Sequence, residues 1–175
     1  MILCICPNPS VDCIVRVPEL IPDNVYRAQD KESFPGGKGI HVAMAARELG
    51  EDTAVLGIWA GPDGEWLRQQ CLDRGIPCHG PVVAGTSRNC LTILTDDGGE
   101  TEVRGLGPEI TQSDIDAFVD TAESLAADES IITGSGSWPP GAPDDAWAQV
   151  LAVVPAARTY LDCAAPYLKP ALEQR

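Results

Sequence analysis

The stretch that decides the fold runs from Phe34 to Leu49 and reads FPGGKGIHVAMAAREL. Gly36, Gly37 and Gly39 surround Lys38, and residues that predict a helix follow without a break. Glycine allows a ligand or another segment to approach the main chain closely, and the N-terminus of a helix attracts anionic or hydroxyl-rich ligands. The stretch therefore predicts either a ligand-binding loop or a tight turn before a buried helix. The immediate start of the helix favours the binding loop.

Strands and helices alternate on both sides of this stretch. Residues 2–6 (ILCIC) and 53–59 (TAVLGIW) are continuous apolar runs, which are typical of strands buried on both faces of a parallel sheet. Half-exposed strands are expected in four further segments, at 11–17, 25–32, 89–95 and 100–105. The sequence therefore predicts an α/β protein in which a parallel sheet carries a small appended β-sheet.

Two local signals predict where elements begin and end. The run Asp96-Asp97-Gly98-Gly99 is a strong hairpin signal between two of the half-exposed strands. Thr111 is followed three residues later by Asp114, in the manner of a capping box. This second signal predicts a helix over about 111–127.

Length, composition and charge exclude several classes of protein. The 175 residues fit one domain, and the 44% apolar fraction argues against disorder. The longest apolar runs are too short to cross a membrane, and the N-terminus lacks the basic region of a secretory signal. A net charge of −14 argues against general nucleic-acid binding. Seven scattered cysteines are typical of reduced thiols, so we expect a cytoplasmic protein without nucleic-acid or membrane partners.

Common nucleotide and metal signatures are not present. A Walker loop needs Ser or Thr after its Gly-Lys pair, but Gly39 follows Lys38. The dinucleotide fingerprint fails in the segment 134–139, where its third glycine is replaced by Pro139. The cysteines and histidines lack zinc-type spacing, so no metal site is predicted. An unrelated nucleotide-binding α/β protein is therefore disfavoured.

Three polar residues lie where ligands bind in open α/β sheets. Such ligands sit beyond the carboxyl ends of the strands, and Asp12 comes shortly after the first strand. Its carboxylate could accept hydrogen bonds from sugar hydroxyls or could cap a turn. Arg88 could pair with a phosphate through its planar fork or could be a surface charge. Ser137, in a turn rich in glycine and proline, could contact a ligand or serve only the turn.

Taken together, these segments resemble the phosphosugar branch of the ribokinase-like (PfkB) carbohydrate kinases, which includes 1-phosphofructokinase and tagatose-6-phosphate kinase. The similarity extends over essentially all of residues 1–175. The matching segments, in order, are NPSVD at 8–12, RA at 27–28, PGGKGIHVA at 35–43, LG at 49–50, TSRNCLTI at 86–93, DGGETEVRGLGPEIT at 98–111, GSWPPGAP at 136–143 and LDC at 161–163.

The resemblance implies a fold, a reaction and a site. The fold would be a parallel sheet flanked by helices, with the appended strands forming a lid that closes over the sugar and often forms the dimer contact. The reaction would be ATP-dependent phosphorylation of a sugar phosphate such as fructose 1-phosphate, fructose 6-phosphate or tagatose 6-phosphate, with Mg²⁺. The substrate-binding residues implied by position are Asp12, Gly36, Gly37, Lys38, His41, Arg88 and Ser137, with Arg27 assisting. Among these, Asp12 would hold sugar hydroxyls and Arg88 the existing phosphate.

Two departures from the family pattern qualify these expectations. The family usually has Asn where this chain has His41. The imidazole is larger than the Asn side chain, so we expect this position to affect which substrate is preferred. Family members are nearly twice as long, and their further half brings a Gly-Ala-Gly-Asp segment with the general base and most of the ATP site. No catalytic residue is therefore expected among these 175 residues, which represent the N-terminal portion of such a kinase. Phosphoryl transfer depends on such groups, so we expect little or no kinase activity from this chain alone.

The same departures leave alternatives open. The chain could be a non-catalytic sugar-phosphate-binding module or the remnant of a truncated kinase gene. The strands and helices of a further half would cover apolar surface on this one, and an uncovered apolar face associates. We therefore expect either a homodimer through the lid strands or association through the truncated face.

Overall fold

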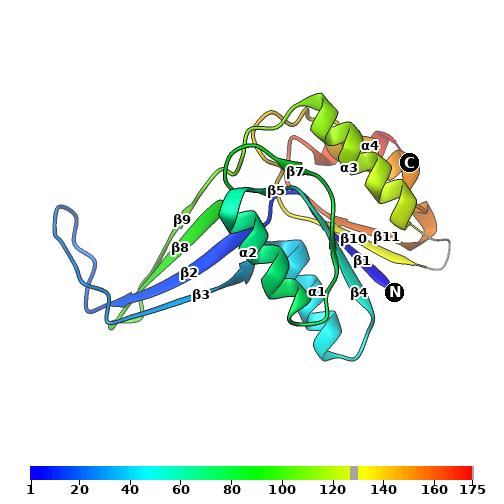
Figure 1. Ribbon diagram of the computed structural model, residues 1–175. Helices are drawn as coiled ribbons and strands as arrows, with labels where there is room; N and C mark the ends of the chain where they lie inside the picture. The colour runs from blue at the N-terminus through cyan, green and yellow to red at the C-terminus, as the bar shows by residue number, and fades with distance from the viewer. Residues whose placement is uncertain (127–129, 175) are drawn as a thin grey trace.

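The computed structural model describes residues 1–126 and 130–174 and is built on a five-stranded parallel sheet. Helices cover this sheet on both sides (Figure 1). The strands, in spatial order, are β11 (Thr159–Asp162), β10 (Ile131–Ser135), β1 (Ile2–Cys6), β4 (Thr53–Gly57) and β6 (Cys78–His79). The predicted α/β class with a parallel sheet is confirmed.

The helices form two layers, one on each face of the sheet. Figure 1 shows α1 (Lys38–Glu48) and α2 (Gly61–Leu72) on one side, and α3 (Gln112–Leu125) and α4 (Ala146–Val153) on the other. Three shorter elements and the last helix also belong to this part of the molecule: β5 (Trp59–Ala60), β7 (Val82–Val83), a 3-10 turn (Ala156–Arg158) and α5 (Leu168–Glu173). Within the part of the chain that the structure describes, no helix has both the length and the hydropathy needed to span a bilayer.

Side chains of the central strand β1 alternate between two apolar cores. Leu3 and Ile5 pack in the cluster that includes residues of α3 and α4. Cys4 and Cys6 pack in the cluster that includes residues of α1 and α2. Since successive side chains of a strand point to opposite faces, a strand covered on both sides must be apolar throughout. This requirement explains the unbroken run ILCIC.

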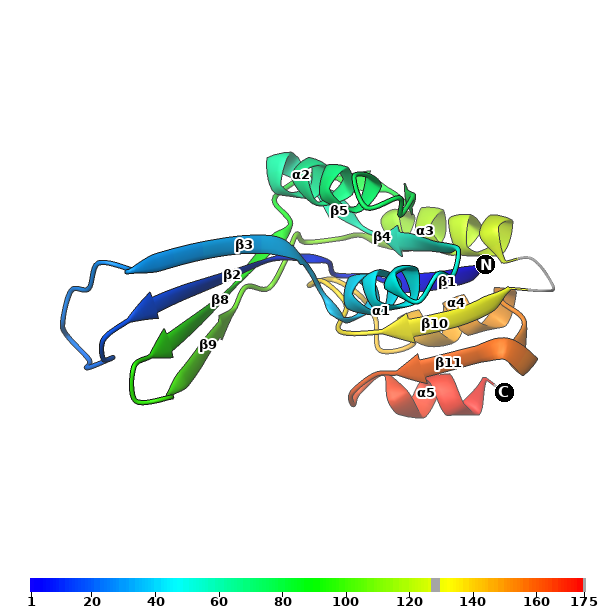
Figure 2. The same cartoon turned by 90° about the horizontal axis from the view of Figure 1, so that it is seen from below.

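A second sheet of four strands extends away from the parallel sheet (Figures 1 and 2). Its strands, in spatial order, are β3 (Asp30–Gly36), β2 (Ser10–Val17), β8 (Arg88–Thr95) and β9 (Glu100–Arg104). We call it the outer sheet. The β8 and β9 strands pair antiparallel on either side of the Asp96–Gly99 turn, as the hairpin signal predicted.

One strand of the outer sheet lies later in the chain than predicted. The expected segment 25–32 gives way to β3, which begins at Asp30 and continues to Gly36. The first residue of β3 pairs with Arg16, close to the end of β2, so the residues before it have no strand beside them. Val25 accordingly is 96% exposed. Its β-branched side chain favours a strand, but a strand also needs a partner along its edge.

The helix predicted over about 111–127 corresponds to α3. Thr111 and Asp114 form the expected capping box, in which the backbone N–H of Thr111 donates to the Asp114 carboxylate over 2.8 Å. The helix ends at Leu125, and the predicted end at residue 127 lies outside the described residues.

The glycine-rich stretch connects the two sheets. Gly36 ends β3, Gly37 is the N-cap of α1 with φ of 97°, and Lys38 is the first helical residue. The helix therefore begins directly at the lysine. A Cβ atom at Gly39 would lie 2.5 Å from the Cβ of Cys6, so the first turn of α1 lies against the end of β1 as only glycine permits.

The buried cysteines give a first testable prediction. All seven cysteines are free; Cys4, Cys6, Cys71 and Cys90 are buried and three others are partly exposed. Burial raises the pKa of Cys6 to about 11, and only the thiolate reacts. Titration with Ellman's reagent is therefore expected to detect at most three thiols in the folded chain and all seven in guanidinium. Rapid modification of Cys6 in the native chain would contradict this packing.

Candidate functional site

Strand pairing brings charged residues onto one face of the outer sheet. Ser10 lies opposite Arg88, Asp12 opposite Cys90, and Cys90 opposite Arg104. Residues that face each other across strands share a face of the sheet, as do residues two apart along one strand. The Asp12, Arg88 and Arg104 side chains therefore lie on the same side of the outer sheet.

This face borders a cavity of about 450 Å³ at the carboxyl ends of β10 and β11. The far wall of the cavity includes Ser137, just after β10, and Asp162, the last residue of β11. The start of α1 provides a third wall with Lys38 and His41. The cavity thus lies where open α/β sheets bind ligands.

The structure brings most of the predicted site residues together. Those that line the cavity are Asp12, Gly37, Lys38, His41, Arg88 and Ser137. Gly36 lies against the Asp12 carboxylate, because a Cβ atom at Gly36 would come within 2.1 Å of the Asp12 carboxyl carbon. Arg27 is exposed in the segment between β2 and β3 and does not line this cavity.

Asp12 is oriented by two neighbours. The Ser10 hydroxyl donates to Asp12 Oδ1 over 2.7 Å, and His41 Nε2 lies 3.4 Å from Asp12 Oδ2. Burial alone would raise the pKa of Asp12, but hydrogen bonds from His41 and Ser10 and the charge of Arg88 lower the pKa below its ordinary value. The carboxylate is therefore ionised and held in one orientation, as an acceptor for ligand hydroxyl groups must be.

Arg88 is held at the junction of the two sheets. Its Nε donates to the backbone carbonyl oxygen of Asn8 over 3.1 Å, and Asn8 in turn donates from Nδ2 to the carbonyl of Leu106 over 2.9 Å. The contact of Arg88 uses Nε and positions the planar fork beside the cavity. A fork of this kind matches the oxygens of a phosphate group.

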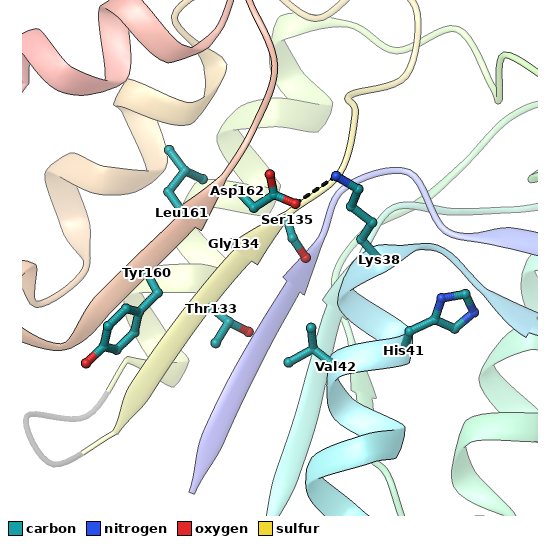
Figure 3. Close-up of a pocket in the computed structure, with 9 residues that line it drawn as sticks. All are labelled: Lys38, His41, Val42, Thr133, Gly134, Ser135, Tyr160, Leu161 and Asp162. Carbon is teal, nitrogen blue, oxygen red and sulfur yellow. Dashed lines mark hydrogen bonds and ion pairs between the residues drawn. The ribbon is translucent and has the colours of Figure 1, made fainter.

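Lys38 forms an ion pair across the cavity rim. Its Nζ lies 2.7 Å from Asp162 Oδ2, and Figure 3 shows this contact between the start of α1 and the end of β11. Both side chains are more than 60% exposed, so the pair contributes little to stability. It does place the ammonium group beside the ligand cavity.

An apolar groove adjoins this ion pair on the α1 side of the parallel sheet. Its volume is about 380 Å³, and Val42, Thr133, Ser135 and Tyr160 are among the side chains that line it (Figure 3). The Tyr160 side chain is 67% exposed. Ser135 is 6% exposed and its buried Oγ atom has no hydrogen-bond partner among the described residues. The groove is therefore a part of the sheet that this chain does not cover.

The cavity lining also includes residues that the sequence did not single out, among them Ser10, Glu102, Arg104 and Asp162. Asp162 lies in the matched segment LDC at 161–163, and this match is the signal that could have identified it. Arg104 and Glu102 lie in a segment that also matched the family. The register between β9 and β8 decides which face of the outer sheet these two side chains lie on. That register cannot be read from the sequence.

The described residues contain no cluster of the usual metal-ligand side chains. No group of three or more His, Cys, Asp or Glu side chains within residues 1–126 and 130–174 is placed to hold a metal ion. Protein sites for Mg²⁺ supply one or two carboxylates together with substrate phosphates.

Solved structures share this architecture. A candidate phosphofructokinase from Staphylococcus aureus is 26% identical, with a TM-score of 0.83. Phosphofructokinase-2 from Escherichia coli, in complex with fructose-6-phosphate, is 22% identical with a TM-score of 0.88. A possible 1-phosphofructokinase from Thermotoga maritima is 22% identical with a TM-score of 0.90. Each comparison covers 99% of this chain but only 56%, 58% and 57% of the respective relative.

The parallel sheet, its two helical layers and the outer sheet thus define the fold of a ribokinase-like kinase. The model of the pfkB family carbohydrate kinases matches residues 5–174. The chain belongs to the pfkB family of carbohydrate kinases. It spans somewhat more than half the length of the solved relatives.

Proposed function

We propose that this chain provides the sugar-phosphate side of an ATP-dependent kinase that acts on fructose 1-phosphate, fructose 6-phosphate or tagatose 6-phosphate. One observation carries the proposal: an ionised carboxylate, Asp12, and a positioned guanidinium, Arg88, line the same cavity of about 450 Å³. The carboxylate accepts hydrogen bonds from sugar hydroxyls, and the guanidinium binds the phosphate already present. The fructose 6-phosphate complex of a structural relative supports the substrate class.

The other predicted residues complete this proposed site. Gly36 leaves room for the Asp12 carboxylate, and Gly37 and Lys38 form the wall at the start of α1. Ser137 offers a hydroxyl from the opposite wall. His41 contacts Asp12, and as a larger group than the usual Asn it narrows the space beside the sugar. In this proposal the general base and most of the ATP site are supplied by residues other than these 175.

Binding and turnover together test this proposal. Isothermal titration calorimetry with the three sugar phosphates, and with unphosphorylated fructose as control, is expected to show binding that depends on the phosphate. A coupled kinase assay with ATP and Mg²⁺ is expected to show little or no turnover by the 175-residue chain alone. Absence of binding to all three sugar phosphates would contradict the proposal.

The second candidate is a non-catalytic sugar-phosphate-binding module, or a remnant of a truncated kinase gene. The observation in its favour is that the side chains lining the cavity supply charge and hydrogen-bond partners for a ligand. Binding of a sugar phosphate without turnover would fit both a non-catalytic binding module and the sugar-phosphate side of a kinase. Restoration of turnover by addition or fusion of a segment that carries the Gly-Ala-Gly-Asp motif would favour the kinase.

Self-association of the chain is a further prediction, and its surface can be located. Tyr160 and Ile131 expose apolar surface on β11 and β10, at 67% and 41%, and Val103 exposes 58% on the face of the outer sheet turned away from the cavity. Sedimentation velocity is expected to show dimers or larger species. Tyr160→Glu should reduce association through the groove beside α1, whereas Val103→Glu should reduce a dimer through the lid strands. A monomer at all concentrations would contradict both modes.

The tetrameric inhibited form of phosphofructokinase-2 from Escherichia coli supports the proposed self-association of this chain. We also propose a cytoplasmic location. The seven free cysteines support it, because thiols stay reduced in that compartment.

A further inference from the structure

Two charged side chains in the cavity have no role in the function proposed above. Glu102 and Arg104 are two residues apart on β9, so they share a face of the outer sheet. They form an ion pair between Arg104 Nη2 and Glu102 Oε2. Both side chains line the cavity together with Asp12 and Arg88.

Arg104 is placed to act on the same ligand group as Arg88. It lies directly opposite Cys90 on β8, and Arg88 is two residues from Cys90 along that strand. The two arginines are therefore diagonal neighbours, about 7–8 Å apart, and long side chains at such positions can meet. Both also line an adjoining cavity of about 500 Å³ together with Ser137. A phosphate near Ser137 would have a guanidinium on each of two neighbouring strands.

The Glu102 carboxylate binds one nitrogen of the Arg104 fork, Nη2. The hydrogen bond from Arg104 lowers the pKa of Glu102, so this carboxylate is ionised at neutral pH. A carboxylate and a phosphate bind an arginine fork in the same way, through two parallel hydrogen bonds. A phosphate that binds this fork through two parallel hydrogen bonds therefore competes with Glu102 for Nη2.

We propose that Arg104 is a second phosphate-binding arginine of this site and that Glu102 is an internal anion that competes with the ligand for it. The inference rests on the proposed function for the identity of the ligand. It makes Glu102 a residue that determines specificity. A phosphate group carries nearly two negative charges, so Arg104 binds it more strongly than it binds the Glu102 carboxylate. A sugar acid offers Arg104 only a single carboxylate, so its exchange with Glu102 brings no such gain.

A double-mutant cycle tests this competition. The ligand is whichever of fructose 1-phosphate, fructose 6-phosphate and tagatose 6-phosphate binds the unmodified chain most tightly by calorimetry. Arg104→Gln is expected to weaken binding about tenfold, the size of one charged hydrogen bond. Glu102→Gln is expected to tighten binding about threefold. In the Arg104→Gln background, Glu102→Gln should bring no gain.

Two control variants lie on the same face of the outer sheet outside the cavity. Arg16 is on β2, four residues beyond Asp12, and Glu32 lies opposite Ile14 on β3. Arg16→Gln and Glu32→Gln change the net charge as the test variants do, and both should leave binding unchanged. Gluconate serves as the single-carboxylate ligand, and Glu102→Gln should narrow the preference for the sugar phosphate over gluconate.

Each outcome decides the matter. The inference fails if Arg104→Gln binds the sugar phosphate like the unmodified chain, or if the gain from Glu102→Gln persists without Arg104. If the unmodified chain binds no sugar phosphate, the proposed function fails, and inorganic phosphate followed by ³¹P NMR line broadening tests the arginine pair alone. Equal phosphate binding by Arg104→Gln and Arg16→Gln would then overturn the role of Arg104.

Discussion

Replacement of Asp12 by asparagine is expected to lower the affinity of this chain for sugar phosphates about 100-fold. The Asp12 carboxylate is held by Ser10 and His41 so that it faces the cavity. Each hydrogen bond between a ligand hydroxyl and this carboxylate contributes about 1.5–3 kcal/mol. An asparagine of nearly the same shape keeps one acceptor oxygen but has no charge. The cost of about one such bond is therefore expected in the dissociation constant measured by calorimetry.

Glu32→Gln is the matched control for this prediction. Glu32 lies on β3, the strand beside Asp12, opposite Ile14 and therefore on the same face of the outer sheet, but outside the cavity. Its replacement removes one negative charge from the same surface and should change the dissociation constant less than about twofold. If Asp12→Asn binds as tightly as Glu32→Gln, the carboxylate does not hold the sugar.

The pH dependence of this effect follows from the pKa of Asp12. The pKa in the folded chain lies below the ordinary value of 3.8, so the carboxylate is ionised at about pH 5 as well as at about pH 8. The loss of affinity in Asp12→Asn should therefore be the same at both pH values. Because the folded-state pKa is the lower one, the stability from this network is present above pH 3.8 and is lost as the pH falls through the folded-state pKa.

Replacement of Gly39 by valine is expected to destabilise the fold by about 3 kcal/mol or more. A Cβ atom at this position would lie 2.5 Å from Cys6 Cβ and 2.9 Å from the carbonyl oxygen of Ile5. The second of these is backbone of the central strand, which cannot move without disturbing its pairs with β4 and β10. The first turn of α1 must therefore shift away from the sheet.

The measurement is guanidinium unfolding followed by tryptophan fluorescence, at one protein concentration because association affects apparent stability. The expected loss corresponds to a fall in melting temperature of about 6–12 °C for a domain of this size. Ala45→Ser, on the exposed side of the same helix, should stay within about 0.5 kcal/mol of the unmodified chain. A Gly39→Val variant as stable as Ala45→Ser would show that α1 does not lie against β1 at Gly39.

Local patterns predicted those parts of the fold that depend on residues close in sequence. The apolar run at 2–6, the hairpin at 96–99 and the capping box at Thr111 each specify their structure through their own side chains. The strand expected at 25–32 shows the limit of such patterns. A strand begins where a partner strand is available, and β2 offers its edge to β3 only from Asp30 onward.

The candidate site divides in the same way. Asp12, Lys38 and Arg88 could be singled out because each sits at a glycine turn or beside a predicted strand. Glu102 and Arg104 could not, since a strand has two faces and a shift of one residue in register reverses them. Only the pairing of Cys90 with Arg104 turns both side chains toward the cavity.

The sequence by itself determined the α/β class, the family resemblance and the helix that starts at the glycine-rich stretch, because these follow from local periodicity and from ordered motifs. The tertiary structure alone decided which charges meet. Lys38 reaches Asp162 from a position 124 residues away in the chain, and Arg88 donates to the carbonyl of Asn8 from the other side of the sheet junction. Contacts of this kind arise from the register and packing of whole strands. They join segments that are far apart in the chain, so they cannot be predicted from any single segment.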